Sequence, residues 1–207
     1  MSICLNWRLF LEENSIRAVI VGIPGVGKTT VISEVQSILQ KRGMNAETAV
    51  FGTLMFEQAN KKGLKNRDEI RNLSITDQRN LQEDAAKKIS GMRARVIIID
   101  THLFIKTSEW YYPGVPLNVS QIISPTHLLL IIADAGEIRL RRQADTTRHR
   151  DLPSKEDIQR EIDLSMMMIV SLANLTGSPF TMIENNNNQA EKAAQDIARI
   201  LVGNICS

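Results

Sequence analysis

Cysteines, aromatic residues and long hydrophobic runs are all scarce in this chain. Its two cysteines, Cys4 and Cys206, form no Cys-x-x-Cys motif and no Cys/His spacing of a metal site, which excludes a disulfide framework and favours a reducing, cytoplasmic setting. No apolar stretch approaches the ~20 residues that a membrane helix needs, so we expect no membrane association. The first 14 residues lack the basic and small-residue pattern of a secretory signal peptide.

Charge and aromatic content argue against a nucleic-acid partner. The net charge is only +2, and aromatic residues make up 4% of the chain, whereas RNA-binding surfaces combine basic patches with stacking aromatic rings. The one aromatic cluster, at 110–112, is expected to pack a loop or a subunit contact. The run at 60–63 resembles the Asn-Lys-x-Asp motif of GTPases but lacks its Asp, which argues against a guanine-binding switch.

Short apolar runs alternate with longer amphipathic stretches along most of the chain. The apolar runs predict strands at 18–21, 49–51, 96–99, 128–132 and 180–183. Helical periodicity predicts helices at 30–42, 54–62, 68–72, 76–90, 135–144, 155–174 and 189–202. The runs at 96–99 and 128–132 are apolar without alternation, as in strands buried on both faces of a parallel sheet. Together with the alternation of strands and helices, they indicate a doubly wound α/β domain with a five-stranded parallel sheet flanked by helices. The asparagine run at 185–188 is expected to be a loop without a function of its own.

Residues 22–29, Gly-Ile-Pro-Gly-Val-Gly-Lys-Thr, fit the pattern G-x-x-x-x-G-K-[ST] of a phosphate-binding loop. An apolar run precedes them and a helical pattern follows, which is the context that the motif requires. In such a loop, backbone N–H groups and the helix N-terminus bind phosphate oxygens. Lys28 is predicted to reach the β- and γ-phosphates, and Thr29 to ligate Mg²⁺. The combination disfavours a glycine-rich turn without a ligand.

Polar residues directly follow the apolar run at 96–99. Asp100 is predicted to bind Mg²⁺, directly or through water, although an Asp at this place can also cap the next segment. His102 is a candidate for a substrate contact, and a structural role for it is equally open.

Five arginines gather between residues 139 and 151, as a cluster that predicts a catalytic lid: Arg139, Arg141, Arg142, Arg148 and Arg150. Arg139, Arg142, Arg148 and Arg150 are the candidates for a short catalytic lid, because arginine forks suit phosphate oxygens and can stabilise charge during phosphoryl transfer. The alternative is a solvated helix face.

A third cluster follows the second predicted strand. Gly52 and Thr53 open a helix there, and Arg67 and Arg71, four residues apart, are predicted to share one helix face. Two arginines on one face can bind the phosphate of an acceptor. Local pairing with Asp68 or Glu69 is the alternative.

Taken together, these segments resemble the archaeal adenylate kinase family within the nucleoside monophosphate kinases. The matching segments are 22–30, 51–57, 67–73, 100–102, 106–107, 113–116 and 140–151. The resemblance begins at about residue 18, so residues 1–17 are expected to be an N-terminal extension and 18–207 the P-loop domain, with a lid at about 139–151.

The resemblance implies a P-loop NTPase fold with a short, zinc-free lid and the reaction ATP + AMP ⇌ 2 ADP with Mg²⁺, which maintains adenine nucleotide balance. It also implies a homotrimer. The ATP-binding residues by this resemblance are Gly22, Ile23, Pro24, Gly25, Val26, Gly27, Lys28, Thr29 and Thr30. The AMP-side residues are Gly52, Thr53, Arg67, Arg71 and His102, and the catalytic charges are Lys28, Arg139, Arg142, Arg148 and Arg150.

Two alternatives remain at this point. A kinase for another nucleoside monophosphate such as CMP, or for another small acceptor, would carry the same phosphate loop and lid. A P-loop protein that binds nucleotide without metabolic turnover would carry the same loop alone.

Overall fold

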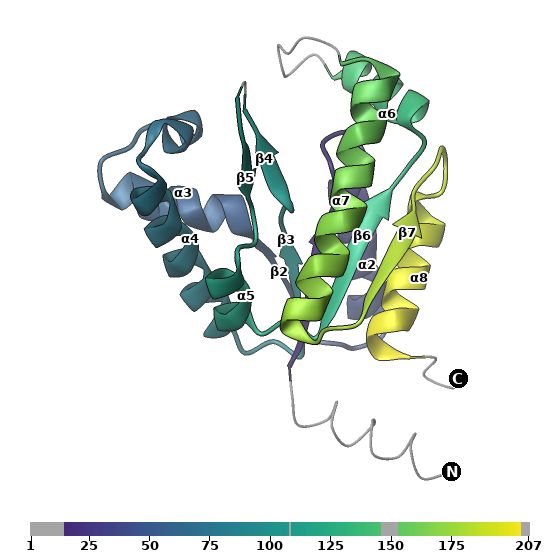
Figure 1. Cartoon of the computed structure of the whole chain (residues 1–207). Coiled ribbons are helices and arrows are strands. Elements are labelled where there is room, and N and C mark those ends of the chain that lie inside the picture. The colour runs from purple at the N-terminus through teal and green to yellow at the C-terminus, as the bar shows by residue number, and fades with distance from the viewer. Residues whose placement is uncertain (1–14, 108, 146–152, 204–207) are drawn as a thin grey trace.

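A five-stranded parallel sheet runs through the middle of the protein, and helices pack on both of its faces (Figure 1). The computed structural model describes residues 15–107, 109–145 and 153–203. The strand order is β2-β3-β1-β6-β7, and every neighbouring pair is parallel. The predicted α/β class and the five-stranded parallel sheet are confirmed.

The strand that leads into the phosphate loop lies at the centre of this sheet. β1 (Ile16–Val21) pairs with β3 (Val96–Asp100) on one side and with β6 (His127–Ile132) on the other. β2 (Ala46–Val50) and β7 (Phe180–Glu184) are the two edge strands. All five strands agree with the expected positions to within a few residues.

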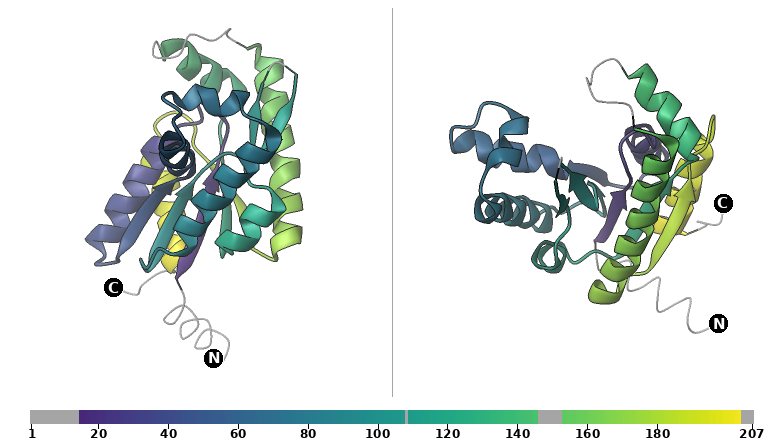
Figure 2. Two further views of the ribbon diagram at one scale, coloured as in Figure 1. Left: turned by 90° about the vertical axis from the view of Figure 1, so that its left-hand side faces the viewer. Right: turned by 45° about the horizontal axis from the view of Figure 1, so that its top comes forward.

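Helices cover the sheet in two layers (Figure 2). Their bounds are α2 (Lys28–Lys41), α3 (Phe51–Lys61), α4 (Ile75–Ser90), α5 (Leu117–Ile123), α6 (Ala135–Ala144), α7 (Lys155–Thr176) and α8 (Ala190–Val202). α2 and α8 pack against each other on one face, and α7 covers β6 and β7 from the other. α3 and α4 form an arm beside β2 (Figure 1).

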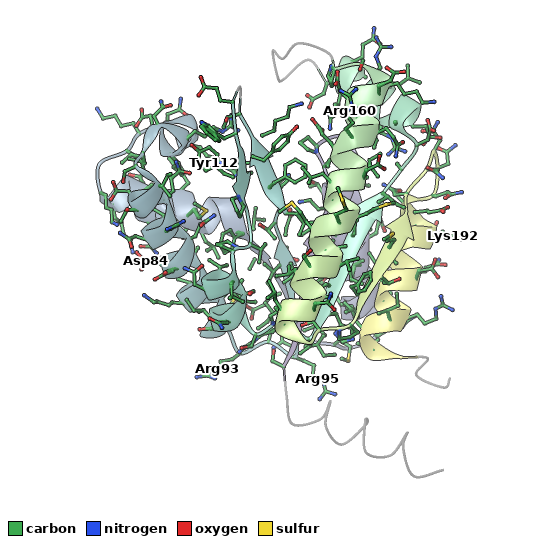
Figure 3. All side chains as sticks on the ribbon, in the orientation of Figure 1. Asp84, Arg93, Arg95, Tyr112, Arg160 and Lys192 are labelled. Atoms are coloured by element: carbon green, nitrogen blue, oxygen red, sulfur yellow. The ribbon has the colours of Figure 1, made fainter. Side chains whose placement is uncertain are left out.

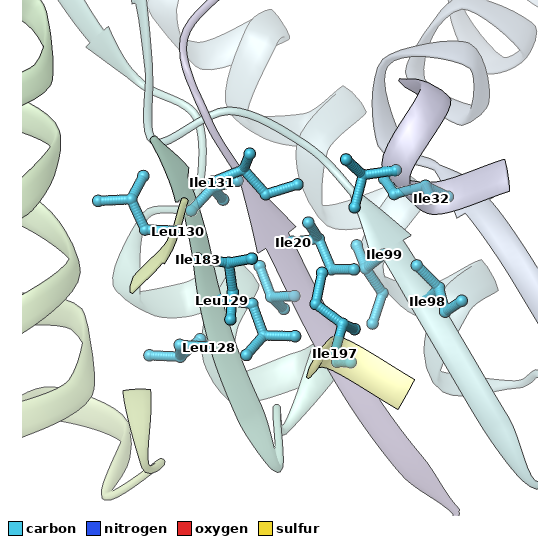
Figure 4. Packing of buried hydrophobic residues seen from close by; sticks show 14 of the residues in the cluster. Ile20, Ile32, Ile98, Ile99, Leu128, Leu129, Leu130, Ile131, Ile183 and Ile197 are labelled. Carbon is cyan, nitrogen blue, oxygen red and sulfur yellow. The ribbon is translucent and has the colours of Figure 1, made fainter. Parts of the chain in front are cut away.

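The core lies between the central strands and these helices. Ile97, Ile98 and Ile99 of β3 are fully buried, because a central parallel strand has a helix layer on each side. Figure 4 shows Ile32 of α2 and Ile197 of α8 packed over the same strands. Burial of each such aliphatic side chain contributes about 1.5–3 kcal/mol to the free energy of unfolding. The packed sheet therefore holds the loops at its carboxyl end in fixed positions.

The segment before α4 differs from the prediction. Residues 67–72 form a 3₁₀ helix, η1 (Arg67–Asn72), and not an α-helix. A 3₁₀ helix has three residues per turn, so residues three apart share a face and residues four apart do not. The predicted common α-helical face for Arg67 and Arg71 is therefore wrong.

Sequence periodicity also missed a β-hairpin and a short helix between β3 and β6. β4 (Phe104–Lys106) and β5 (Tyr111–Pro113) pair antiparallel, and α5 follows them. Strands of three residues are too short for an alternation pattern to be visible. Of the aromatic cluster at 110–112, Tyr111 packs edge-on against Phe104 with ring centroids 5.3 Å apart, whereas Trp110 is 64% exposed.

Figure 3 separates the two ends of the sheet. Arg93 and Arg95 lie at the end where the parallel strands begin, and Tyr112 and Arg160 lie toward the end where they finish. Within the described residues, no helix has the length and apolar character needed to cross a membrane.

Candidate active site

The phosphate loop connects the end of β1 to the start of α2. Gly25 and Gly27 both have φ of 85°, in the left-handed region where a side chain would be strained, so the loop requires glycine there. Gly27 is the N-cap of α2, whose first turn contains no acidic residue. The partial positive charge at this helix N-terminus is therefore available to an anion.

Lys28 places a buried positive charge in this loop. The residue is 8% exposed, and its Nζ contacts Oδ1 of Asp100 at the end of β3. The contact follows from the sheet register, in which Asp100 lies beside Ile20 of β1. Although Asp100 is close, burial and then the nearby charge of Arg67 lower the pKa of Lys28 from 10.5 to about 8. An anion bound here would favour the protonated lysine.

Thr29 and Asp100 are suited to Mg²⁺. Thr29 is exposed in the first turn of α2, and the Asp100 side chain is 13% exposed. The described residues contain no cluster of three His, Cys, Asp or Glu side chains. Mg²⁺ is commonly held by one or two protein oxygens together with waters and substrate phosphates, so this small oxygen donor set fits it.

Arg142 contacts the phosphate loop through a backbone carbonyl oxygen. Its Nε donates to the Pro24 carbonyl at 2.8 Å, and its Nη2 donates to Glu161 Oε2 at 2.8 Å. Glu161 is buried on α7 and also accepts from Lys106 Nζ of β4 at 3.3 Å. Arg142 is therefore connected to the loop, to α7 and, through Glu161, to the hairpin.

Arg141 and Asn185 also contact the loop, and sequence reasoning, although it placed Arg141 in the arginine cluster, named neither of them as a site residue. Both donate to the Val26 carbonyl, Asn185 Nδ2 at 2.8 Å and Arg141 Nη1 at 3.3 Å. For Glu161, a signal was present in the sequence, since this charged residue falls among the buried positions of α7. For Asn185 no signal was present: the predicted loop at 185–188 is confirmed, and within it the Asn185 side chain bonds to the phosphate loop.

Of the other lid candidates, only Arg139 lies within the described residues. Arg139 is exposed on α6. Arg148 and Arg150 lie outside the described residues. Their catalytic roles stay predictions.

On the acceptor side, Gly52 and Arg67 come together. A Cβ atom at Gly52 would overlap Nη2 of Arg67, so only glycine allows the guanidinium to lie against the start of α3. Arg67 is also close enough to Lys28 to affect its pKa. These contacts bring one acceptor-side arginine near the phosphate loop.

Of the other residues predicted for the acceptor, Thr53 follows Gly52 on α3 and Arg71 lies on η1 together with Arg67. Thr53 lines a cavity of about 380 Å³ together with residues of β2 and α4. Arg71 lies on η1 and is exposed. His102 borders a small cavity beside Gly22 and Pro24, and so lies at the donor loop.

The fold resembles solved shikimate kinases. The enzyme from Acinetobacter baumannii, in complex with shikimate, superposes with a TM-score of 0.58 at 14% identity, covering 93% of this chain and 96% of that one. The enzyme from Bacteroides thetaiotaomicron gives a TM-score of 0.58 at 12% identity, covering 90% and 98%. A family profile described as "AAA domain" matches residues 21–159. Fold and site together define a P-loop protein with a kinase fold.

Sequence relatives narrow this class. The adenylate kinase of Methanocaldococcus jannaschii is 40% identical, covering 88% of this chain and 96% of the relative. Those of Pyrococcus furiosus and Thermoplasma acidophilum are 39% and 38% identical, covering 88% and 89% of this chain and 93% and 98% of the relatives. The chain belongs to the adenylate kinase family.

Because the pKa of Lys28 is lowered in the folded state, the free energy of unfolding of the unmodified protein should depend on pH differently from that of Lys28→Met. The lysine titrates near pH 8 when folded and at 10.5 when unfolded, so at pH 7 its charge destabilises the folded state. Between pH 8 and 10.5 the unfolded state binds more protons than the folded state, so the stability of the unmodified protein should rise with pH. Lys28→Met removes this titration and also leaves Asp100 without its partner at every pH in this range, so the stability of the unmodified protein relative to Lys28→Met should increase by about 1–3 kcal/mol between pH 7 and pH 10. Urea denaturation at pH 7, 8, 9 and 10 measures it, and a difference that stays constant would contradict this account.

Proposed function

We propose that this protein catalyses reversible transfer of the γ-phosphoryl group of ATP to AMP, giving two ADP, and so maintains adenine nucleotide balance. One observation carries the proposal. In a chain about 40% identical to adenylate kinases, the charge of Arg67 on the α3–α4 side acts on the buried Lys28 of the phosphate loop and helps to lower its pKa. A donor phosphate at Lys28 and an acceptor phosphate at Arg67 would be neighbours, which is the arrangement that direct transfer needs.

On the donor side, the loop and the start of α2 hold the ATP phosphates through backbone N–H groups, with Lys28 reaching the β- and γ-phosphates. The geometry of Gly25 and Gly27 and the unopposed positive end of α2 support this role. Mg²⁺, held by Thr29 and by Asp100 directly or through water, would neutralise charge on the triphosphate. Lys28, attracted to the phosphates, would then leave Asp100 free for the metal shell.

On the acceptor side, Gly52, Thr53, Arg67, Arg71 and His102 are the AMP residues that we infer. Arg67 is best supported, because its guanidinium lies against Gly52 and near the loop. The AMP phosphate would pair with this guanidinium, which suits phosphate oxygens as a planar fork.

During transfer, negative charge spreads over the transferred phosphoryl group and needs positive partners. We infer that Arg139, Arg142, Arg148 and Arg150 supply them as the segment at about 139–151 closes over the site. Arg142 starts next to the loop, bonded to the Pro24 carbonyl and to Glu161, and would have to leave these partners to reach the phosphoryl group. Closure would also exclude water, so that the phosphoryl group passes to AMP and not to water.

Removing a transition-state charge should lower turnover without unfolding the protein. Lys28→Ala and Arg142→Ala should each reduce kcat by roughly 10²–10³ or more, the size of effect that single charge stabilisers have. ADP formation from ATP and AMP, followed with a coupled assay, measures this. Arg160→Ala is the control, since Arg160 is 79% exposed and bonds to Asp157 on the same helix. Turnover near that of the unmodified protein in Lys28→Ala and Arg142→Ala would contradict the assignment of these residues.

The acceptor is tested by offering a panel of monophosphates. With ATP as the donor, AMP should give the highest kcat/KM, and CMP, UMP and GMP should give much lower values. ADP formation with each monophosphate measures the preference. Formation of ADP with another monophosphate but not with AMP would refute the proposed acceptor and favour a kinase for that nucleotide.

We further infer that the protein is cytoplasmic and acts as a homotrimer, as the family resemblance implies. Of the eleven large hydrophobic side chains exposed among the described residues, five lie on α7 and the edge strand β7: Met167, Val170, Leu175, Phe180 and Met182. Such a concentration supports self-association. Light scattering of the purified protein should give three times the 23.2 kDa of one chain. A mass of one chain at micromolar concentration would refute the trimer.

A further inference from the structure

One carbonyl oxygen of the phosphate loop accepts two side-chain hydrogen bonds. Asn185 Nδ2 donates to the Val26 carbonyl at 2.8 Å, and Arg141 Nη1 donates to the same oxygen at 3.3 Å. Asn185 directly follows β7, and Arg141 lies on α6. Two segments distant in sequence therefore converge on a single peptide group.

Both side chains are themselves held in place. Asn185 is 3% exposed, and its backbone N–H donates to the Ile132 carbonyl at the end of β6 at 2.8 Å. Arg141 Nη2 donates to the Asn185 carbonyl at 3.0 Å and to Glu137 at 3.2 Å. The guanidinium thus joins α6, the segment after β7 and the loop into one network. The packing is close, since a Cβ atom on Gly27 would lie 2.5 Å from Asn185 Nδ2.

The geometry of the peptide group gives these contacts a consequence. The peptide between Val26 and Gly27 is trans and planar, so its C=O and its N–H point in opposite directions. Donors that hold the carbonyl therefore turn the Gly27 N–H away from Arg141 and Asn185. A charged donor on the carbonyl also polarises the peptide and makes its N–H a stronger donor.

We propose that Arg141 and Asn185 are positioning residues that hold the Val26–Gly27 peptide in the orientation that binds the donor triphosphate. They act through the Gly27 N–H and do not touch the nucleotide themselves. The inference rests on the proposed function in one respect, because it takes the ligand of the loop to be ATP. The two neighbouring arginines therefore have different proposed roles: Arg141 positions the loop, and Arg142 stabilises charge on the transferred phosphoryl group.

The experiment measures the affinity for an ATP analogue and the affinity for AMP in separate titrations. We expect Arg141→Ala to weaken binding of the non-hydrolysable analogue β,γ-imido-ATP by about ten- to a hundredfold, and Asn185→Ala by about fivefold, as the loss of a charged and a neutral hydrogen bond. Titration calorimetry with Mg²⁺ present gives these values. Binding of AMP alone, in a second titration, should change less than about twofold, because the network contacts only the donor loop.

Matched controls are available on exposed helix positions. Asn174→Ala on α7 and Arg199→Ala on α8 remove the same two side-chain types far from the loop, and Arg199 pairs only locally with Asp196. Both should bind the analogue as the unmodified protein does. Arg141→Lys keeps the charge but loses the fork, so its affinity should lie between those of the unmodified protein and Arg141→Ala.

Amide chemical shifts distinguish a local change in the orientation of the Val26–Gly27 peptide from a general loss of structure. In nitrogen–proton correlation spectra, the Gly27 amide should shift in Asn185→Ala and in Arg141→Ala, while the distant Gly203 amide should not. If circular dichroism finds Asn185→Ala unfolded, Arg141→Ala and Arg141→Lys decide the question.

Unchanged affinity for β,γ-imido-ATP in the folded variants would overturn the inference. Equal losses of affinity for the analogue and for AMP would also overturn it, since they would indicate a role in the fold as a whole. Failure of the unmodified protein to bind the analogue would overturn the proposed function instead.

Discussion

The buried ammonium group of Lys28 is the feature on which the site depends. A buried charge is tolerated only when it is paired, and the parallel register of β1 and β3 brings Asp100 to it. The burial, the positive end of α2 and the charge of Arg67 all act against the protonated lysine when no anion is bound. The same groups favour phosphate once it arrives, so the folded state without nucleotide already has the electrostatics of a phosphate site.

Behind the loop, a second set of interactions acts on its carbonyl oxygens. Arg142 bonds to Pro24, while Arg141 and Asn185 bond to Val26. Because these donors take the carbonyl sides, the opposite N–H sides of the same peptides are left for the ligand. Glu161 then connects Arg142 to Lys106, so the hairpin after β3, the helices α6 and α7 and the loop belong to one polar network.

Much of the fold could be predicted because its signals are local. The buried strands read as continuous apolar runs, and α6 has the limits that its periodicity predicted. The failures have physical causes. β4 and β5 are three residues each, too short for a periodic signal, and η1 takes a 3₁₀ conformation that changes which residues share a face. Among the arginines, spacing along the chain could not tell which would contact the loop.

The sequence by itself determined the phosphate loop, since its glycines, lysine and hydroxyl are contiguous and its conformation depends on those glycines and on the helix that follows. Tertiary structure decided which distant residues support that loop. The pairs that do so are far apart in the chain: Pro24 and Arg142 are separated by 118 positions, and Val26 and Asn185 by 159 positions. Such contacts arise only when strand order brings the ends of β1, β6 and β7 together, and no local pattern in the asparagine run distinguishes the one side chain that becomes buried against the loop.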